Sequence, residues 1–164
     1  MITDRTPATE AFWNRSRSEL GISAPECHVS SLFDPLILDP SNPHLDLSDQ
    51  PELIGAGKKR GTAHLAADFA RHGIPRRQVG DYWVLLNPDA TPMCLVRVTA
   101  VIEQPFDRVP LDWARVEGEG DESLAWWQEA HRQYYIRQCA NWGVTWDESA
   151  PIVCEAWELV AMAG

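Results

Sequence analysis

Two short segments of the sequence carry side chains that could bind a ligand or move a proton. The first is Gly57-Lys58-Lys59-Arg60-Gly61-Thr62, in which two glycines allow a tight turn and a close approach of the backbone to a ligand. A lysine acts as a base only if desolvation lowers its pKa, and a threonine hydroxyl is a weak nucleophile unless a base adjoins it. The spacing is not that of a G-x-x-x-x-G-K-[ST] phosphate-binding loop. The segment alone is therefore either a ligand-binding turn or a solvated basic turn.

The second segment is Val116-Glu117-Gly118-Glu119-Gly120-Asp121-Glu122-Ser123. Carboxylates this close repel one another, which raises their pKa values unless positive charge offsets them. Three roles would explain the cluster: a general acid or base, a salt bridge to Lys59 or Arg60, or a divalent-metal site. The simpler explanation is that Asp121 and Glu122 stabilise the start of a helix. That explanation fits the first glutamate of the segment least well, and we expect any chemistry to lie where the two segments meet.

Two more polar residues lie in apolar patterns. His131 follows Trp127 by four residues and precedes Tyr135 by four, at the edge of an apolar helical stripe, and we interpret it as a structural histidine. Arg97 alternates with apolar neighbours in a predicted strand. If it faces the interior it needs an acidic partner, for which Glu155 is a candidate. Such a pair is either structural or part of a ligand site.

The surrounding pattern predicts a mixture of helices and strands. Helices are expected over 7–20, 51–56, 62–71 and about 122–141, and strands over 82–86, 93–101 and 152–160. Thr6-Pro7 is typical of a helix start, and Asp121 or Ser123 can cap the long helix. The turn between the first two strands indicates a hairpin. This pattern favours an α+β fold with a small sheet or barrel.

The same pattern leaves two connecting segments without regular structure. Residues 34–51 contain four prolines and are predicted to form a loop. This loop does not resemble a domain linker, because the part of the chain before it is too small to fold alone. Residues 104–111 are expected to form a further connection. We therefore predict a single domain over 1–164, with an N-terminal helical extension and this proline-rich loop.

Composition limits the classes of function. The chain has 164 residues and a formal net charge of −10, a balance that repels phosphate backbones and argues against a sequence-independent nucleic-acid coat. The four cysteines form no C-x-x-C pair, so a zinc site is not expected. The first residues, MITDRTPATE, resemble no signal peptide, and no apolar run is long enough to span a membrane. We expect a cytoplasmic protein with no membrane partner.

Several motifs together resemble the ASCH domain family. Gly57-x-Lys59-x-x-Thr62 matches the family's G-x-K-x-x-T signature. The other matching segments are Val79-Gly80-Asp81-Tyr82, Pro105-Phe106-Asp107-x-Val109, Glu117-Gly118-Glu119-Gly120-Asp121-x-Ser123-Leu124-x-x-Trp127-x-x-x-His131 and Val153-Cys154-Glu155. Their order agrees with the family from about Leu53 to Val160, and the EGEGD-x-SL block indicates one branch of it.

The resemblance implies a PUA-like fold, a small β-barrel with flanking α-helices and a cleft at one end. PUA-like domains commonly bind RNA or modified bases. Some ASCH proteins are ribonucleases on single-stranded RNA, and others are amidohydrolases that deacylate N4-acetylcytidine with the signature lysine and threonine and a glutamate. Carried over, Lys59 and Thr62 match directly, and Glu117 is the first choice for the glutamate, with Glu119 second. The small amidohydrolases usually have an arginine two residues after the threonine, where this chain has His64.

Two functions follow from the resemblance and the residues. A hydrolase would act on RNA or a modified nucleoside, with Lys59 positioning or deprotonating, Thr62 as nucleophile or water-orienting group, and Glu117 moving the proton. The alternative is a non-catalytic RNA- or nucleotide-binding module, in which Arg76 and Arg77 would join the basic turn and a tryptophan or tyrosine would stack on a base. The expected substrate-binding residues are Gly57, Lys58, Arg60, Glu119, Asp121, Ser123 and Arg97. No cofactor is expected, although the sequence does not exclude a divalent metal. It also does not decide the oligomeric state, for which a homodimer is one alternative.

Overall fold

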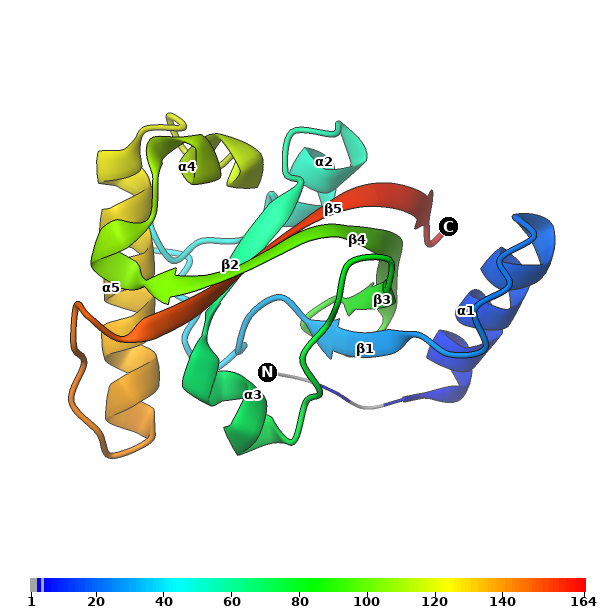
Figure 1. The fold of residues 1–164 in the computed structure, drawn as a ribbon, viewed down its shortest axis with the longest axis horizontal. Coiled ribbons are helices and arrows are strands. Elements are labelled where there is room, and N and C mark those ends of the chain that lie inside the picture. The colour runs from blue at the N-terminus through cyan, green and yellow to red at the C-terminus, as the bar shows by residue number, and fades with distance from the viewer. Residues whose placement is uncertain (1–2, 4) are drawn as a thin grey trace.

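A five-stranded mixed sheet forms the centre of the molecule (Figure 1). In this computed structural model, which describes residue 3 and residues 5–164, the strand order is β1-β3-β4-β5-β2. The strands are β1 His28–Ser31, β2 Gly61–Leu65, β3 Tyr82–Leu86, β4 Pro92–Pro105 and β5 Pro151–Met162. Of the four strand pairs in this described part of the chain, β1–β3 is parallel and the other three are antiparallel. The sheet curves into a half-barrel, which confirms the predicted α+β class and the β3–β4 hairpin.

Helices flank the sheet. They are α1 Pro7–Glu19, α2 Gln50–Gly55, α3 Ala66–His72, α4 Leu111–Glu117 and α5 Leu124–Asn141, and a 3-10 turn covers Phe106–Arg108. In Figure 1 α4 and α5 lie at one end of the sheet and α1 at the other. Thr6 caps α1 by accepting a hydrogen bond from the Thr9 N–H, and Ser123 caps α5 by accepting one from the Trp126 N–H. The cap of the long helix is thus one of the two residues predicted for it.

The expected helix over 62–71 is wrong in its first half. Gly61–Leu65 is strand β2, all five residues of which are buried, and it pairs antiparallel with β5. The spacing of Leu65 and Phe69 fits a helix, but pairing with β5 satisfies the backbone groups of the buried segment and overrides local propensity. Thr62 therefore lies on a strand, which fixes its position more firmly than a helix start would.

The segment before the long helix also differs from expectation. Leu111–Glu117 is helix α4, although the sequence indicates only a connection up to residue 111 there. The two long strands β4 and β5 extend beyond their predicted ends and pair with each other along most of their length. Glu117 is therefore the last residue of α4, packed under the start of α5 rather than exposed in a loop.

Apolar residues of β2, α4 and α5 form one core cluster, which includes Trp113, Trp127 and Tyr135. Trp127 and Tyr135 are each 1% exposed, so this end of the sheet is closed by aromatic packing. The four cysteines are free and buried, in agreement with the prediction of buried thiols. Among the helices described, none is long and apolar enough to cross a membrane.

Candidate active site

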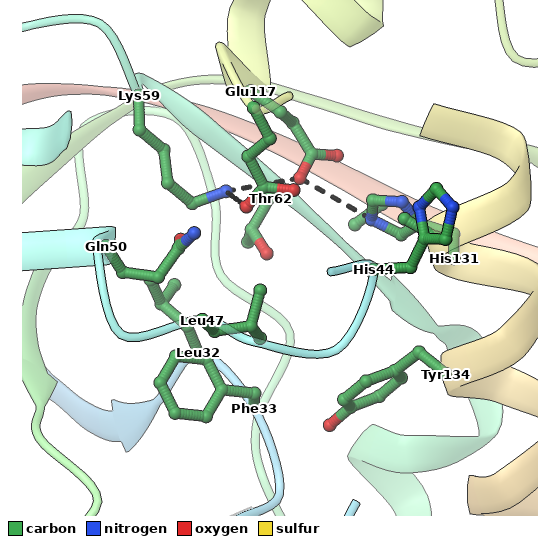
Figure 2. Close-up of a pocket in the computed structure, with 13 residues that line it drawn as sticks. Leu32, Phe33, His44, Leu47, Gln50, Lys59, Thr62, Glu117, His131 and Tyr134 are labelled. Atoms are coloured by element: carbon green, nitrogen blue, oxygen red, sulfur yellow. Dashed lines mark hydrogen bonds and ion pairs between the residues drawn. The ribbon is translucent and has the colours of Figure 1, made fainter. Parts of the chain in front are cut away.

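A cavity of about 50 Å³ lies between β2, the α4–α5 turn and the segment from Leu32 to Gln50. Figure 2 shows its two sides: Lys59, Thr62, Glu117 and His131 form a polar side. The opposite side comes from the 32–50 segment and is largely apolar. It is formed by Leu32, Phe33, Leu47 and Gln50, with His44 and Tyr134 near one end.

Lys59 is the positive centre of the polar side. Its Nζ donates to Glu119 Oε1 at 2.7 Å and to Glu117 Oε2 at 3.3 Å, and the residue is only 3% exposed. Burial alone would lower the pKa of Lys59, but Glu119 and Glu117 outweigh burial and raise the pKa above its ordinary value. Lys59 is therefore a charged ammonium group and not a base.

Glu117 is held by four donors. Its Oε1 accepts hydrogen bonds from the indole N–H groups of Trp113 and Trp127, at 3.1 and 2.8 Å. Its Oε2 lies 3.5 Å from His131 Nε2, as well as near Lys59. Burial alone would raise the pKa of Glu117, but His131 and Lys59 outweigh burial, and the pKa lies well below the ordinary range. An anion so completely bonded is a stable anchor and a poor proton acceptor.

His131 completes the charged cluster. Its Nδ1 donates to the Trp127 carbonyl at 2.9 Å, and its ring stacks on the Trp127 indole with centroids 4.1 Å apart. Burial alone would lower the pKa of His131, but Glu117 outweighs burial and raises the pKa. The imidazole is thus fixed in one orientation, with Nε2 directed at Glu117.

A glycine lets the two segments meet. Gly118 has a φ of +63°, and a Cβ there would clash with the Lys58 carbonyl oxygen. The backbone of the α4–α5 turn therefore packs directly against the basic turn, which brings Glu117 and Glu119 within reach of the Lys59 ammonium group. The Arg60 N–H donates to the Val116 carbonyl at 2.8 Å and closes the same contact.

Thr62 lies beside this cluster on β2, 5% exposed and facing the cavity (Figure 2). Its strand position fixes Thr62 on the polar side of the cavity without a flexible loop. His64, two residues further along, is buried. Burial, together with Arg77, lowers the pKa of His64 well below its ordinary value, so this imidazole is neutral and differs electrostatically from an arginine at the same place.

The opposite side of the cavity is fixed to α5. The Asp34 N–H donates to the Tyr134 hydroxyl at 2.6 Å, and Arg137 pairs with Asp39 at 3.1 Å. The predicted 34–51 loop is confirmed as turns up to residue 49, with α2 beginning at Gln50. It forms one side of the cavity through these anchors.

The structure brings four predicted site residues together: Lys59, Thr62, Glu117 and Glu119 all line the cavity. The other predicted binding residues are elsewhere. Gly57, Lys58 and Arg60 are exposed on the outside of the basic turn. Asp121 accepts a hydrogen bond from the Ser123 N–H at 2.9 Å, and Ser123 caps α5, so both serve the helix start.

The proposed pairing of Arg97 with Glu155 is wrong. Arg97 is exposed and lies 3.5 Å from Glu158, because its position on β4 faces solvent. Glu155 is instead held by Arg77, whose Nε and Nη2 donate to the two carboxylate oxygens at 2.8 and 2.6 Å. Arg77 is 2% exposed, so it is a structural residue and not a phosphate contact, and Arg97 lies outside the cavity.

Sequence reasoning missed several cavity residues. His131 is interpreted above as structural, but it lines the cavity and pairs with Glu117; its i+4 spacing from Trp127 was the available signal. Gln50, His44 and Tyr134 also line the cavity. Nothing in their local sequence marks them, because the 34–49 turns that carry His44 and lead into Gln50 are placed by contacts with helix α5, about 90 residues later.

The sequence and the fold both have counterparts among known proteins. An ASCH domain family model matches residues 46–161. The chain belongs to the ASCH domain family. A crystal structure of an ASCH domain from Lactobacillus crispatus JV V101 is 29% identical, covers 98% of each chain and superposes with a TM-score of 0.78. Protein EF3133 from Enterococcus faecalis V583 is 20% identical over 93% of this chain and 88% of its own, with a TM-score of 0.75. No curated protein matches the sequence.

These matches confirm the PUA-like fold expected from the sequence, a small half-barrel with flanking helices. The ASCH domain is a PUA-like family with a proposed RNA-binding role. The EGEGD-x-SL branch is a finer assignment, and it stays a prediction.

Proposed function

We propose that this ASCH domain is a hydrolase that cleaves an amide bond of a modified nucleoside whose acylated end enters the Lys59 cavity. One observation carries the proposal: an ammonium group, two carboxylates, an imidazole and a hydroxyl meet in one buried cavity. Burying such a cluster costs free energy that well-packed apolar residues would not. Clusters of charged groups in a pocket are typical of catalytic sites.

Lys59 serves the oxyanion in this proposal. Its raised pKa makes it unsuitable as the base, but its ammonium group can stabilise negative charge as it develops on the substrate's carbonyl oxygen. The Thr62 hydroxyl, on the same side of the cavity, donates to the same oxygen or orients the water. Groups fixed in advance around a developing charge supply much of the rate enhancement in many enzymes.

Glu119 is the better proton acceptor of the two glutamates. Among the described residues only Lys59 hydrogen-bonds the Glu119 carboxylate, at Oε1, whereas both oxygens of Glu117 are bonded. Glu119 takes one proton from water as the water oxygen bonds to the carbonyl carbon, and the π electron pair moves to the oxygen beside Lys59. When that oxygen re-forms the carbonyl, the C–N bond breaks. Its electron pair stays on nitrogen, which receives the proton from Glu119, so one amide and one water give one acid and one amine. Glu117 positions Lys59 and His131.

Size and charge favour a small substrate. The cavity measures about 50 Å³ and the chain carries a net charge of −10, which repels a long polyanion. A nucleoside has no phosphate, and its acyl group alone needs to reach the polar side.

The test is a turnover assay on N4-acetylcytidine, related acylated nucleosides and a single-stranded RNA, with and without Mn²⁺. Lys59→Met and Thr62→Val are compared with Lys58→Met, which removes the exposed neighbouring lysine. We expect release of the acyl group by the wild type and by the Lys58 control. Lys59→Met should lose about 10²- to 10³-fold in kcat, as when an oxyanion donor is removed. Circular dichroism confirms that each variant is folded.

Two outcomes would contradict the proposal. One is the absence of acyl release from every nucleoside tested. The other is a folded Lys59→Met variant that is as active as Lys58→Met, since the ammonium group would then have no part in the reaction. Cleavage of the RNA alone would indicate a ribonuclease instead.

A second candidate is a binding module without turnover. Lys58 and Arg60 are exposed at the turn that carries Lys59, where they can contact a phosphate. This function predicts an affinity for short single-stranded RNA that falls steeply with salt and is weakened by Lys58→Met. An affinity that does not change with salt would argue against phosphate contacts.

A further inference from the structure

Gln50 is a buried polar side chain that the cavity leaves without a protein partner. The residue is 2% exposed and lines the cavity. Its backbone N–H donates to the Leu47 carbonyl, but no described residue hydrogen-bonds its side-chain amide. In Figure 2 the amide points into the cavity from the side opposite His131. An amide that lines a cavity and has no protein partner is available to hydrogen-bond to a bound molecule.

The position of Gln50 is coupled to that of Lys59. Gln50 is the first residue of α2, and the chain turns directly from α2 into the basic segment. The N–H groups of Lys58 and Lys59 both donate to the Leu53 carbonyl, at 2.9 and 3.1 Å. The backbone segments that carry Gln50 and Lys59 are therefore linked by hydrogen bonds, and both side chains line the same cavity, which favours a ligand that contacts both.

We propose that Gln50 is a specificity-determining residue that hydrogen-bonds to the edge of a planar heterocycle carrying a donor beside an acceptor. The inference deepens the proposed function and rests on it, since the heterocycle is the part of the substrate next to the amide bond. A glutamine amide offers both a donor and an acceptor and so matches such an edge with two hydrogen bonds.

The remaining surface of the cavity fits the same ligand. Leu32, Phe33 and Leu47 lie around Gln50 and offer apolar contact to the faces of a ring, while the amide serves its edge. A cavity of about 50 Å³ has room for roughly three to five waters. That space suits a single six-membered ring better than a fused double ring.

The experiment compares two substrates and one binding probe. The substrates are N4-acetylcytidine and acetanilide, an aryl amide whose ring has no hydrogen-bonding edge, and the probe is cytidine, measured by calorimetry. Gln50→Met removes the amide at nearly constant length, Gln50→Asn keeps the amide but shortens it, and Gln78→Met replaces an exposed glutamine outside the cavity as the control. Thermal melts establish that the variants are folded.

We expect Gln50→Met to bind cytidine about 10- to 100-fold more weakly than the wild type and the Gln78 control do. Its preference for N4-acetylcytidine over acetanilide should fall by a similar factor, and Gln50→Asn should lie between. Equal cytidine affinity in all proteins, or no cytidine binding by the wild type, would overturn the inference.

The two proposals fail in different ways. If the wild type hydrolyses neither amide but binds cytidine through Gln50, the hydrolase is wrong and the recognition role of Gln50 stands. If it hydrolyses N4-acetylcytidine with a preference that Gln50→Met leaves unchanged, the hydrolase stands and the recognition role is wrong.

Discussion

Replacing Glu117 by glutamine tests the charged cluster most directly. The substitution keeps the shape of the side chain and one oxygen for the indole N–H groups of Trp113 and Trp127. It removes the negative charge and puts an NH₂ group toward Lys59 and His131, which are both donors. Removing one partner from a buried ion pair costs about 3 to 5 kcal/mol. Because Lys59 keeps Glu119 as a partner at 2.7 Å, we expect the free energy of unfolding to fall by about 3 kcal/mol, near the lower end of this range.

That loss has a characteristic dependence on pH. The pKa of Glu117 is lowered by folding, so its stabilisation is present above the ordinary glutamate pKa and is lost as the pH falls below it. The pKa of His131 is raised by folding, so its stabilisation is present below the ordinary histidine pKa of about 6.5 and is lost as the pH rises through the folded value. The difference in the free energy of unfolding between wild type and Glu117→Gln should therefore be largest between about pH 5 and 6.5 and should become smaller at higher pH.

Urea denaturation of wild type and Glu117→Gln at several pH values measures this difference in the free energy of unfolding. Glu158→Gln is the matched control, because its partner Arg97 is half exposed and such surface pairs contribute at most about 1 kcal/mol. The reasoning is refuted if Glu117→Gln is no less stable than Glu158→Gln. A difference in the free energy of unfolding that stays constant from about pH 5 to pH 9 would show that His131 and Glu117 do not interact as the geometry indicates.

Three further predictions use neighbouring residues as controls. Gly118→Ala should destabilise the fold by more than about 2 kcal/mol, since its Cβ would clash with backbone; Gly143→Ala, also at positive φ but in open space, should cost about 1 kcal/mol in the same urea titration. Arg77→Met should cost about 3 to 5 kcal/mol because it leaves a buried carboxylate unpaired, whereas Arg76→Met, in an exposed pair, should cost less than about 1 kcal/mol; equal melting temperatures would contradict this. His131→Gln should remove the loss of stability that the raised pKa of His131 causes as the pH rises, and an NMR titration of the wild type should show a pKa for the His131 imidazole above its ordinary value.

The helix and strand pattern was predictable where local signals agree with the final packing. The Thr6-Pro7 start of α1 and the Ser123 cap of α5 are confirmed because caps are local hydrogen bonds. Strand β2 was mistaken for a helix because its identity depends on β5, which lies about 90 residues later in the chain. A short apolar run does not distinguish the two structures until its partner is known.

The sequence was sufficient to predict the main charged residues of the site but not the other residues that line the cavity. Lys59 and Glu117 stand out as sequence motifs because a lysine between glycines and a glutamate cluster are unusual compositions. Gln50 and His131 do not stand out: each is an ordinary residue of a loop or helix, and only the docking of the 34–49 turns on α5 brings the two to one cavity. Arg97 shows the opposite error, since alternation with apolar residues does not say which face of a strand is buried.

The charge balance of the cavity bears on the ligand it can accept. Lys59 and a protonated His131 supply two positive charges, and Glu117 and Glu119 supply two negative charges, so the cluster is neutral when His131 is protonated and negative when it is not. A phosphate brought into this cavity would meet a lysine whose charge two carboxylates already offset. A neutral amide, in contrast, develops negative charge only as it reacts, and at that moment Lys59 can shift its interaction from Glu119 to the new oxyanion. The same balance that disfavours binding of a polyanion therefore favours a reaction in which charge appears and disappears beside Lys59.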